Sequence, residues 1–124
     1  MDKFQALQSF WESFGLPAYD ENTVPSGEEA PSFPYITYDT IVSAFGTPVA
    51  MSGSLWYYGP SWAEISKKAI AIGKEISRGG KMIPLDDGAV WIKQGSPFAQ
   101  RMSDPNDMVR RIYINIEAEF LTAD

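Results

Sequence analysis

The chain has 124 residues, the length of one domain built around one core, and we expect residues 1–124 to form a single domain. It contains no cysteine and no histidine, which excludes disulfides, thiolate nucleophiles and the side chain that most often serves as general base or zinc ligand. The net charge is −6, and this acidic balance argues against a surface that binds nucleic acid through its phosphates.

The charge is distributed unevenly along the chain. Residues 1–59 contain seven acidic residues and only Lys3 as a basic one, whereas residues 60–124 contain nine of each sign. A basic bias follows residue 60, carried by Lys67, Lys68, Lys74, Arg78 and Lys81. A solvated helix face is the simplest interpretation of these cations. Opposite charges on two parts of one subunit also suit head-to-tail self-association.

Targeting segments are not recognisable in the sequence. The first residues lack the basic and apolar regions of a signal peptide, and glycines and prolines interrupt the apolar-leaning stretch 41–64. We therefore expect synthesis in the cytosol and no membrane partner.

The first predicted element is a helix over residues 2–14, with Asp2 as its N-cap and with Gly15 and Pro17 ending it. Its apolar face is expected to bury Phe4, Leu7, Phe10, Trp11 and Phe14. Residues 19–34 have neither helical nor strand period, so we expect an acidic loop or arm. Its acidic residues are Asp20, Glu21, Glu28 and Glu29.

Two strands and a second helix are predicted next. Residues 35–45 and 49–58 are rich in β-branched and aromatic residues and are separated by a break at 46–48. The spacing of Ser61 and Glu64 matches a capping box, which predicts a helix from there to about residue 77. Its apolar stripe contains Trp62, Ile65, Ala69, Ile72 and Ile76.

The rest of the chain is predicted as a hairpin, a loop and a final strand. Segments 82–85 and 89–93 flank the turn signal Asp86-Asp87-Gly88, and the polar segment 94–108 is expected to be a long loop. Residues 109–120 alternate between apolar and polar, as in a strand with one buried face. These elements predict an α+β fold: a mainly antiparallel sheet of about four to five strands, with an N-terminal helix and one long helix packed on it.

Side chains that could support catalysis are sparse. Asp86 with Asp87, and Asp104 with Asp107, could hold a cation or act in acid–base chemistry, but the preference of Asp for turns explains both pairs better. We therefore assign no catalytic, cofactor-binding or metal-ligating residue, and an enzyme is the least supported class.

Two sets of side chains are candidates for binding. In the aromatic-rich segment 55–62, the alternation directs Tyr57 and Trp62 inward and Trp56 and Tyr58 outward, where they could contact a protein or stack on a sugar. The polar side of the final strand is either solvated or part of a subunit contact. It consists of Arg111, Tyr113, Asn115, Glu117 and Glu119.

The order of elements, with a few residues in them, resembles the tail terminator (tail completion) proteins of long-tailed bacteriophages and prophages. The resemblance spans about residues 33–121, and the N-terminal helix fits only by its position. The matching features are Phe33-Pro34-Tyr35-Ile36-Thr37-Tyr38 at the first strand, Trp56 in the second, the helix from Ser61 to Ser77, and Asp104-Pro105-Asn106 before the strand from Arg110 to Leu121.

The resemblance implies a structural virion protein without catalysis or cofactor. Such a subunit forms a homo-hexameric ring on assembly, although it can be monomeric in solution, and the ring caps the tail tube and meets the head connector. Its location would be the virion tail, after assembly in the cytoplasm of the bacterial host. DNA would pass nearby without specific binding. The acidic residues of 19–34 would line the lumen, where like charge keeps DNA from sticking, or would form an assembly arm.

Two alternatives remain open. Within phage structure, the chain could be another head–tail joining or minor capsid protein. From a different class, it could be a small carbohydrate-binding module that uses Trp56 and Tyr58.

Overall fold

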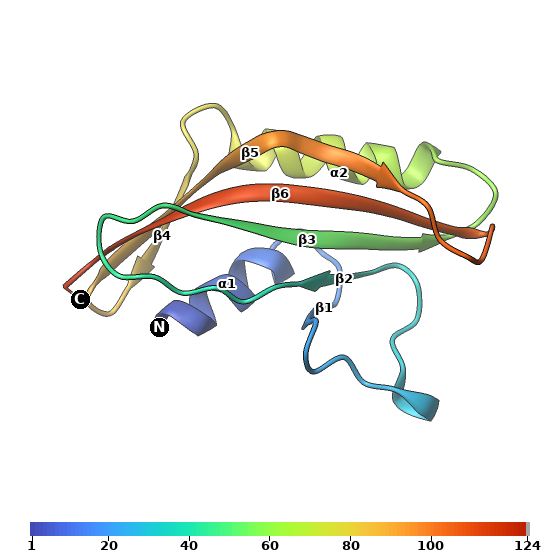
Figure 1. Ribbon diagram of the computed structural model, residues 1–124, viewed down its shortest axis with the longest axis horizontal. Coiled ribbons are helices and arrows are strands. Elements are labelled where there is room, and N and C mark those ends of the chain that lie inside the picture. The colour runs from blue at the N-terminus through green and yellow to red at the C-terminus, as the bar shows by residue number, and fades with distance from the viewer. Residues whose placement is uncertain (124) are drawn as a thin grey trace.

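The computed structural model describes residues 1–123 as two α-helices, a short 3-10 helix and a six-stranded sheet (Figure 1). The α+β prediction is confirmed. In chain order the elements are α1 (Lys3–Glu12), β1 (Ala18–Asp20), η1 (Gly27–Glu29), β2 (Tyr35–Tyr38), β3 (Val49–Tyr58), α2 (Ala63–Ile76), β4 (Lys81–Leu85), β5 (Gly88–Met102) and β6 (Val109–Thr122).

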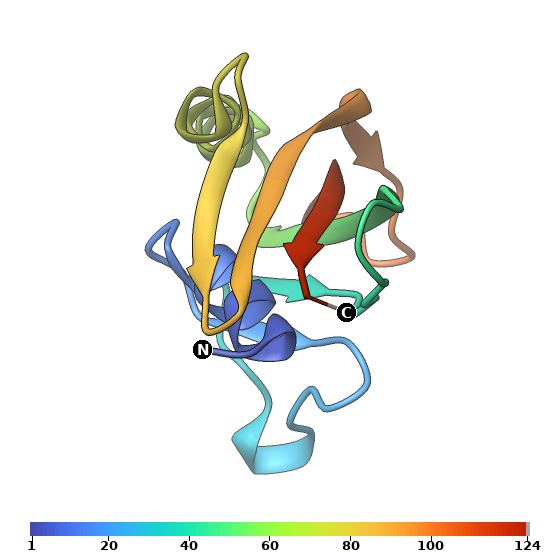
Figure 2. The same ribbon diagram turned by 90° about the vertical axis from the view of Figure 1, so that its left-hand side faces the viewer.

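The sheet is mixed and has the strand order β1-β2-β3-β6-β5-β4. The β1–β2 pair is parallel and the other four pairs are antiparallel, so the sheet is larger than the four to five strands expected but is mainly antiparallel. The long strands β3, β6 and β5 form its centre and curl strongly, as Figure 2 shows.

Strand β3 has the predicted bounds, and β6 begins where predicted and continues to Thr122. The first predicted strand was too long, because β2 ends at Tyr38. The predicted loop over 94–108 was wrong in its first half, since β5 continues to Met102. After an irregularity between Gln94 and Ala99, β5 pairs with β6 again. Backbone pairing with the long strand β6 therefore keeps this polar segment in a strand, although its sequence has no strand period.

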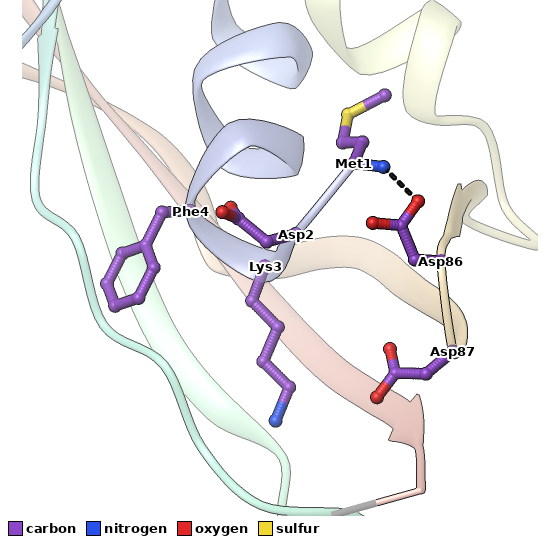
Figure 3. Close-up of a pocket in the computed structure, with 6 residues that line it drawn as sticks. All are labelled: Met1, Asp2, Lys3, Phe4, Asp86 and Asp87. Carbon is purple, nitrogen blue, oxygen red and sulfur yellow. Dashed lines mark hydrogen bonds and ion pairs between the residues drawn. The ribbon is translucent and has the colours of Figure 1, made fainter.

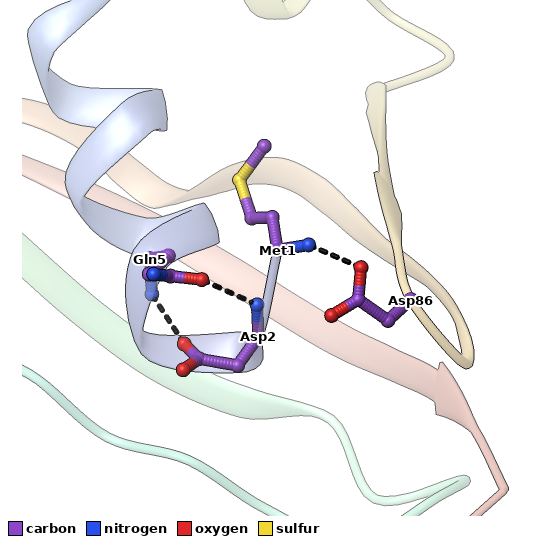
Figure 4. A network of polar contacts seen from close by, with 4 residues as sticks. All are labelled: Met1, Asp2, Gln5 and Asp86. Carbon is purple, nitrogen blue, oxygen red and sulfur yellow. Dashed lines mark hydrogen bonds and ion pairs between the residues drawn. The ribbon is translucent and has the colours of Figure 1, made fainter.

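Helix α1 is shorter than predicted and begins with a reciprocal cap (Figure 4). The backbone N–H of Gln5 donates to the Asp2 carboxylate over 2.8 Å, and the backbone N–H of Asp2 donates to the Gln5 side chain over 2.9 Å. The expected burial of Phe4 was wrong, because 61% of its surface is exposed. The helix instead directs Ala6 into the core beside the predicted residues Leu7, Phe10 and Trp11.

Helix α2 also begins differently from the prediction. Its N-cap is Trp62 and makes no side-chain capping bond, and the Ser61 hydroxyl accepts from the backbone N–H of Ala63 over 3.0 Å rather than from Glu64. The capping-box prediction was therefore wrong, although the helix itself lies where expected. Its predicted stripe is buried, apart from a half-buried Trp62. The buried members are Ile65, Ala69, Ile72 and Ile76.

Both helices lie on the concave face of the sheet (Figures 1 and 2). The inward side chains of β6 are buried beneath them, as predicted. These side chains are Ile112, Ile114, Ile116, Ala118 and Phe120. Helix α1 contacts both β1 and β4, which are the two edge strands of the sheet. The curled sheet therefore wraps around α1.

Trp11 of α1 packs directly over Gly53 of β3. A Cβ atom added at Gly53 would lie 2.6 Å from the Trp11 ring, well inside van der Waals contact. The ring is fully buried and stacks on Tyr38 with centroids 6.0 Å apart, so it has little room to move. Gly53 is required because any larger residue would displace Trp11.

This contact gives a stability prediction. Gly53→Ala should lower the free energy of unfolding by about 1–3 kcal/mol, because the added methyl overpacks the Trp11 site. Gly79→Ala is the matched control, since a Cβ there meets nothing within 4 Å. Urea unfolding followed by tryptophan fluorescence measures both changes, and equal stability of the two variants would contradict the packing argument.

Candidate interaction surface

The convex face of the sheet carries the side chains that alternate away from the helices. Antiparallel pairing of β3 and β6 places Trp56 opposite Arg111 and Ser54 opposite Tyr113. All seven outward residues predicted from the sequence lie on this face, because they occupy alternate positions of the two paired strands. Six are half-buried, and Tyr58 is 56% exposed.

Five of the side chains on this face form a continuous row across four strands. The Tyr35 and Trp56 rings are stacked with centroids 6.1 Å apart and an interplanar angle of 16°, and Tyr19 meets Tyr35 edge-on at 6.3 Å. The Arg111 guanidinium carbon lies 4.5 Å from the Trp56 ring centroid and 4.6 Å from that of Tyr113. We call Tyr19, Tyr35, Trp56, Arg111 and Tyr113 the aromatic row.

Hydrogen bonds fix the centre of the aromatic row. The indole N–H of Trp56 donates to the Thr37 hydroxyl over 2.8 Å, and Nε of Arg111 donates to the Ser54 hydroxyl over 3.1 Å. Burial, together with the charge of Asp104, raises the pKa of Tyr35, so this phenol stays neutral well above pH 7. The row is therefore a rigid surface with one cationic group at its centre.

The other predicted residues of β6 contact their own sheet. The Asn115 amide donates to the Pro97 carbonyl over 2.9 Å, and Glu117 lies 3.5 Å from the Lys93 ammonium. Glu119 lies opposite Trp91 of β5. Asn115 and Glu117 thus hold the irregular strand β5 against β6, and the aromatic row is the half of the face better suited to an external partner.

This arrangement leaves little room for a sugar to stack on the Trp56 ring. An aromatic platform for a sugar needs an open ring face, but Tyr35 flanks Trp56 on one side and Arg111 on the other. Tyr58 keeps an exposed ring, which contacts only Phe33 among the aromatic side chains of residues 1–123, with centroids 5.5 Å apart. The geometry fits a flat protein contact better than a carbohydrate subsite.

Sequence reasoning missed Tyr19 and Tyr35 as members of the aromatic row. Tyr19 falls in a segment without strand period, and it reaches the row because β1 pairs in parallel with β2. Tyr35 opens a predicted strand, so its alternation with the inward Ile36 was a usable signal. The pairing of β2 with β3, which puts Tyr35 opposite Trp56, is determined by the tertiary structure.

The four predicted acidic residues divide into one that is anchored and three that are exposed. Asp20 ends β1, and its carboxylate accepts from the Thr40 hydroxyl and from the backbone N–H of Asn22. The hydrogen bond from Thr40 is the main reason that the pKa of Asp20 lies below its usual value. Glu21, Glu28 and Glu29 are exposed. Residues 21–34 extend away from the body as a loop that contains η1 (Figure 1), and we call them the acidic arm.

In each of the two other carboxylate pairs, one member has a structural partner. Asp86 forms an ion pair with the amino group of Met1, whereas the Asp87 side chain points away from that group (Figure 3). Both aspartates line a shallow pocket together with Asp2, Lys3 and Phe4. Asp104 accepts from the backbone N–H of Asn106 over 2.9 Å, as in an Asx turn. Within residues 1–123, His, Cys, Asp and Glu form no group of three or more that could hold a metal ion.

No protein-family model matches the chain, and no curated protein matches it. Among the described residues, no helix is both long enough and apolar enough to cross a membrane.

The anchoring of Asp20 is testable by pH. Because its pKa is lower in the folded state, Asp20 stabilises the fold above the unfolded pKa near 3.8, and that contribution is lost as the pH falls through the folded pKa. Thr40→Val should raise the pKa of Asp20 and reduce the stability lost between neutral and acidic pH. Thr47→Val, in the same loop, is the control. NMR titration of the carboxyl and unfolding at several pH values measure both effects, and an unmoved Asp20 pKa would contradict the assignment.

Proposed function

We propose that this protein is a structural subunit of a phage tail that assembles into a ring, as the resemblance to tail terminators implies. The ring would cap the tail tube and join it to the head connector. Its location would be the virion tail, after assembly in the host cytoplasm, and the subunit would need neither a cofactor nor catalysis. DNA would pass through the ring without being bound specifically.

The observation that supports this proposal is the rigid aromatic row on a sheet face that neither α1 nor α2 covers. Aromatic and arginine side chains that are held in place before binding lose little conformational entropy on contact, and they are the residue types that dominate protein interfaces. Here the stacked rings and two side-chain hydrogen bonds hold them in position. An assembly subunit needs such a preformed contact surface, whereas a catalytic centre needs convergent titratable groups.

The distribution of titratable groups is consistent with a structural role. Asp20, Tyr35, Tyr38 and Tyr57 each have a shifted pKa. The largest shift raises the pKa of Tyr38 to about 12, through burial and the charges of Asp20 and Glu12. Tyr38 is a core residue stacked on Trp11, while Tyr35 lies on the opposite face of the sheet. These groups therefore do not gather around one cavity.

The assembly proposal predicts a ring that depends on the convex face. Light scattering behind size exclusion should detect an oligomer of the wild-type chain, either alone at high concentration or mixed with a tail tube protein from the same genome. Tyr58→Ala combined with Tyr113→Ala should raise the concentration needed for assembly by on the order of tenfold or more, because interface aromatics are binding hot spots.

Phe4→Ala is the matched control for this experiment. Phe4 is 61% exposed, against 56% for Tyr58, but it lies on α1 and outside the convex face. Circular dichroism should show that all variants fold. A wild-type chain that stays monomeric under both conditions would refute the ring, and equal effects of the two sets of variants would refute the role of the convex face.

A further inference from the structure

The acidic arm has few contacts with its own subunit. Within residues 1–123, the only hydrogen bond of segment 24–32 joins the backbone N–H of Ala30 to the Gly27 carbonyl. Neither Glu28 nor Glu29 takes part in an ion pair in this part of the chain. Two carboxylates and Ala30 are thus exposed on a protruding segment, beside a half-buried Pro31, and neither carboxylate is neutralised within residues 1–123.

A complementary surface lies on α2. Lys67, Ile70 and Lys74 are exposed and share one helix face, because they are spaced by three and four residues. Ile70 is 62% exposed, which is unusual for a large aliphatic side chain. Neither lysine forms an ion pair within residues 1–123.

Beside this helix face, α2 and β5 enclose a shallow groove of about 210 Å³. Its floor is apolar and includes Ala69 and Ile112, while Ser66, Gln100 and Arg101 form polar edges. Arg101 is exposed, packs on the Trp62 ring at 4.8 Å from its centroid, and lies 3.4 Å from the Ser66 hydroxyl. The groove thus combines an apolar floor with a basic margin, and we call it the α2–β5 groove.

The arm and the groove lie on opposite sides of one subunit. In both ribbon views α2 lies at the top of the molecule and the acidic arm at the bottom, with the sheet between them (Figures 1 and 2). The arm therefore cannot reach the groove of its own chain. Two complementary patches on opposite sides of one molecule produce a heterologous contact, which repeats head to tail and closes into a ring when the rotation allows.

We infer that the acidic arm of one copy docks in the α2–β5 groove of the next copy. Glu28 and Glu29 pair with Lys67, Lys74 and Arg101, and Ala30-Pro31 covers Ile70 and the apolar floor. Of the two roles that the sequence left open for the acidic residues, this assigns the arm to assembly. The inference deepens the proposed ring function and rests on it, and it names the occupant of the groove as a second copy of this chain.

A charge exchange tests the contact. Glu28→Lys with Glu29→Lys places cations on the arm, and Lys67→Glu with Lys74→Glu places anions beside the groove. Each double variant alone should lose assembly through like-charge repulsion. An equimolar mixture should regain it, because every junction in an alternating ring then joins opposite charges. Asp87→Lys with Asp107→Lys is the matched control, since it changes the net charge as much as the arm variant does at exposed sites elsewhere and should assemble normally.

Cysteine cross-linking tests the same contact directly. Because the chain has no cysteine of its own, introduced cysteines are the only thiols that react. Ala30→Cys combined with Ile70→Cys should give a ladder of covalent oligomers with a short bis-maleimide. Ladder formation should be on the order of tenfold faster than for Ala30→Cys with Met82→Cys, because docking raises the effective concentration of the paired thiols. Met82 is exposed like Ile70 but lies on the edge strand β4.

The outcomes separate this inference from the ring itself. If both charge variants assemble like the wild type, or if the two cysteine pairs cross-link equally, the arm contact is refuted while the ring proposal stands. If the wild type does not assemble and the Ala30→Cys/Ile70→Cys variant does not cross-link, alone or with the tube protein, both fail. An open filament with efficient cross-linking supports the arm contact and contradicts closure into a ring.

Discussion

The packing of Trp11 against the bare backbone at Gly53 is the contact on which the rest of the structure depends. It brings α1 closer to the sheet than a side chain at that position would allow, and α1 then contacts both edge strands, β1 and β4. A flat sheet could not reach one helix from both edges, so this contact and the curl of β3, β6 and β5 require each other. The buried indole N–H has no hydrogen-bond partner among the described residues, which indicates that shape rather than polar bonding positions Trp11.

Wrapping the sheet around α1 also determines where function can be located. Both helices fill the concave face, so the convex face keeps its outward side chains free of any helical layer. Those side chains contact each other across the strands: Tyr35 meets Trp56, and Trp56 meets Arg111. Cross-strand pairs of this kind stabilise the sheet and at the same time hold the surface in one conformation. One set of contacts therefore supports both the fold and the proposed assembly surface.

The acidic and basic surfaces make the two ends of the subunit different from each other. The acidic arm and the basic margin of the α2–β5 groove belong to different halves of the chain, and the fold places them at opposite ends of the molecule. Interfaces that join unlike patches propagate in one direction, which is what a ring of identical subunits requires. The aromatic row and the arm are also linked physically, because Phe33 at the end of the arm contacts Tyr35 and Tyr58.

The sequence by itself determined the elements whose signal is local. Strands β3 and β6, the stripe of α2 and the hairpin at Asp86–Gly88 follow from periodicity and turn preference, which depend on neighbours a few residues away. Tertiary structure decided the rest. The continuation of β5 through a polar segment, the parallel pairing that brings Tyr19 beside Tyr35, and the exposure of Phe4 all depend on residues far along the chain. Outward residues could be predicted from alternation, but which of them meet in the aromatic row is decided by strand order, and strand order leaves no local pattern in a sequence.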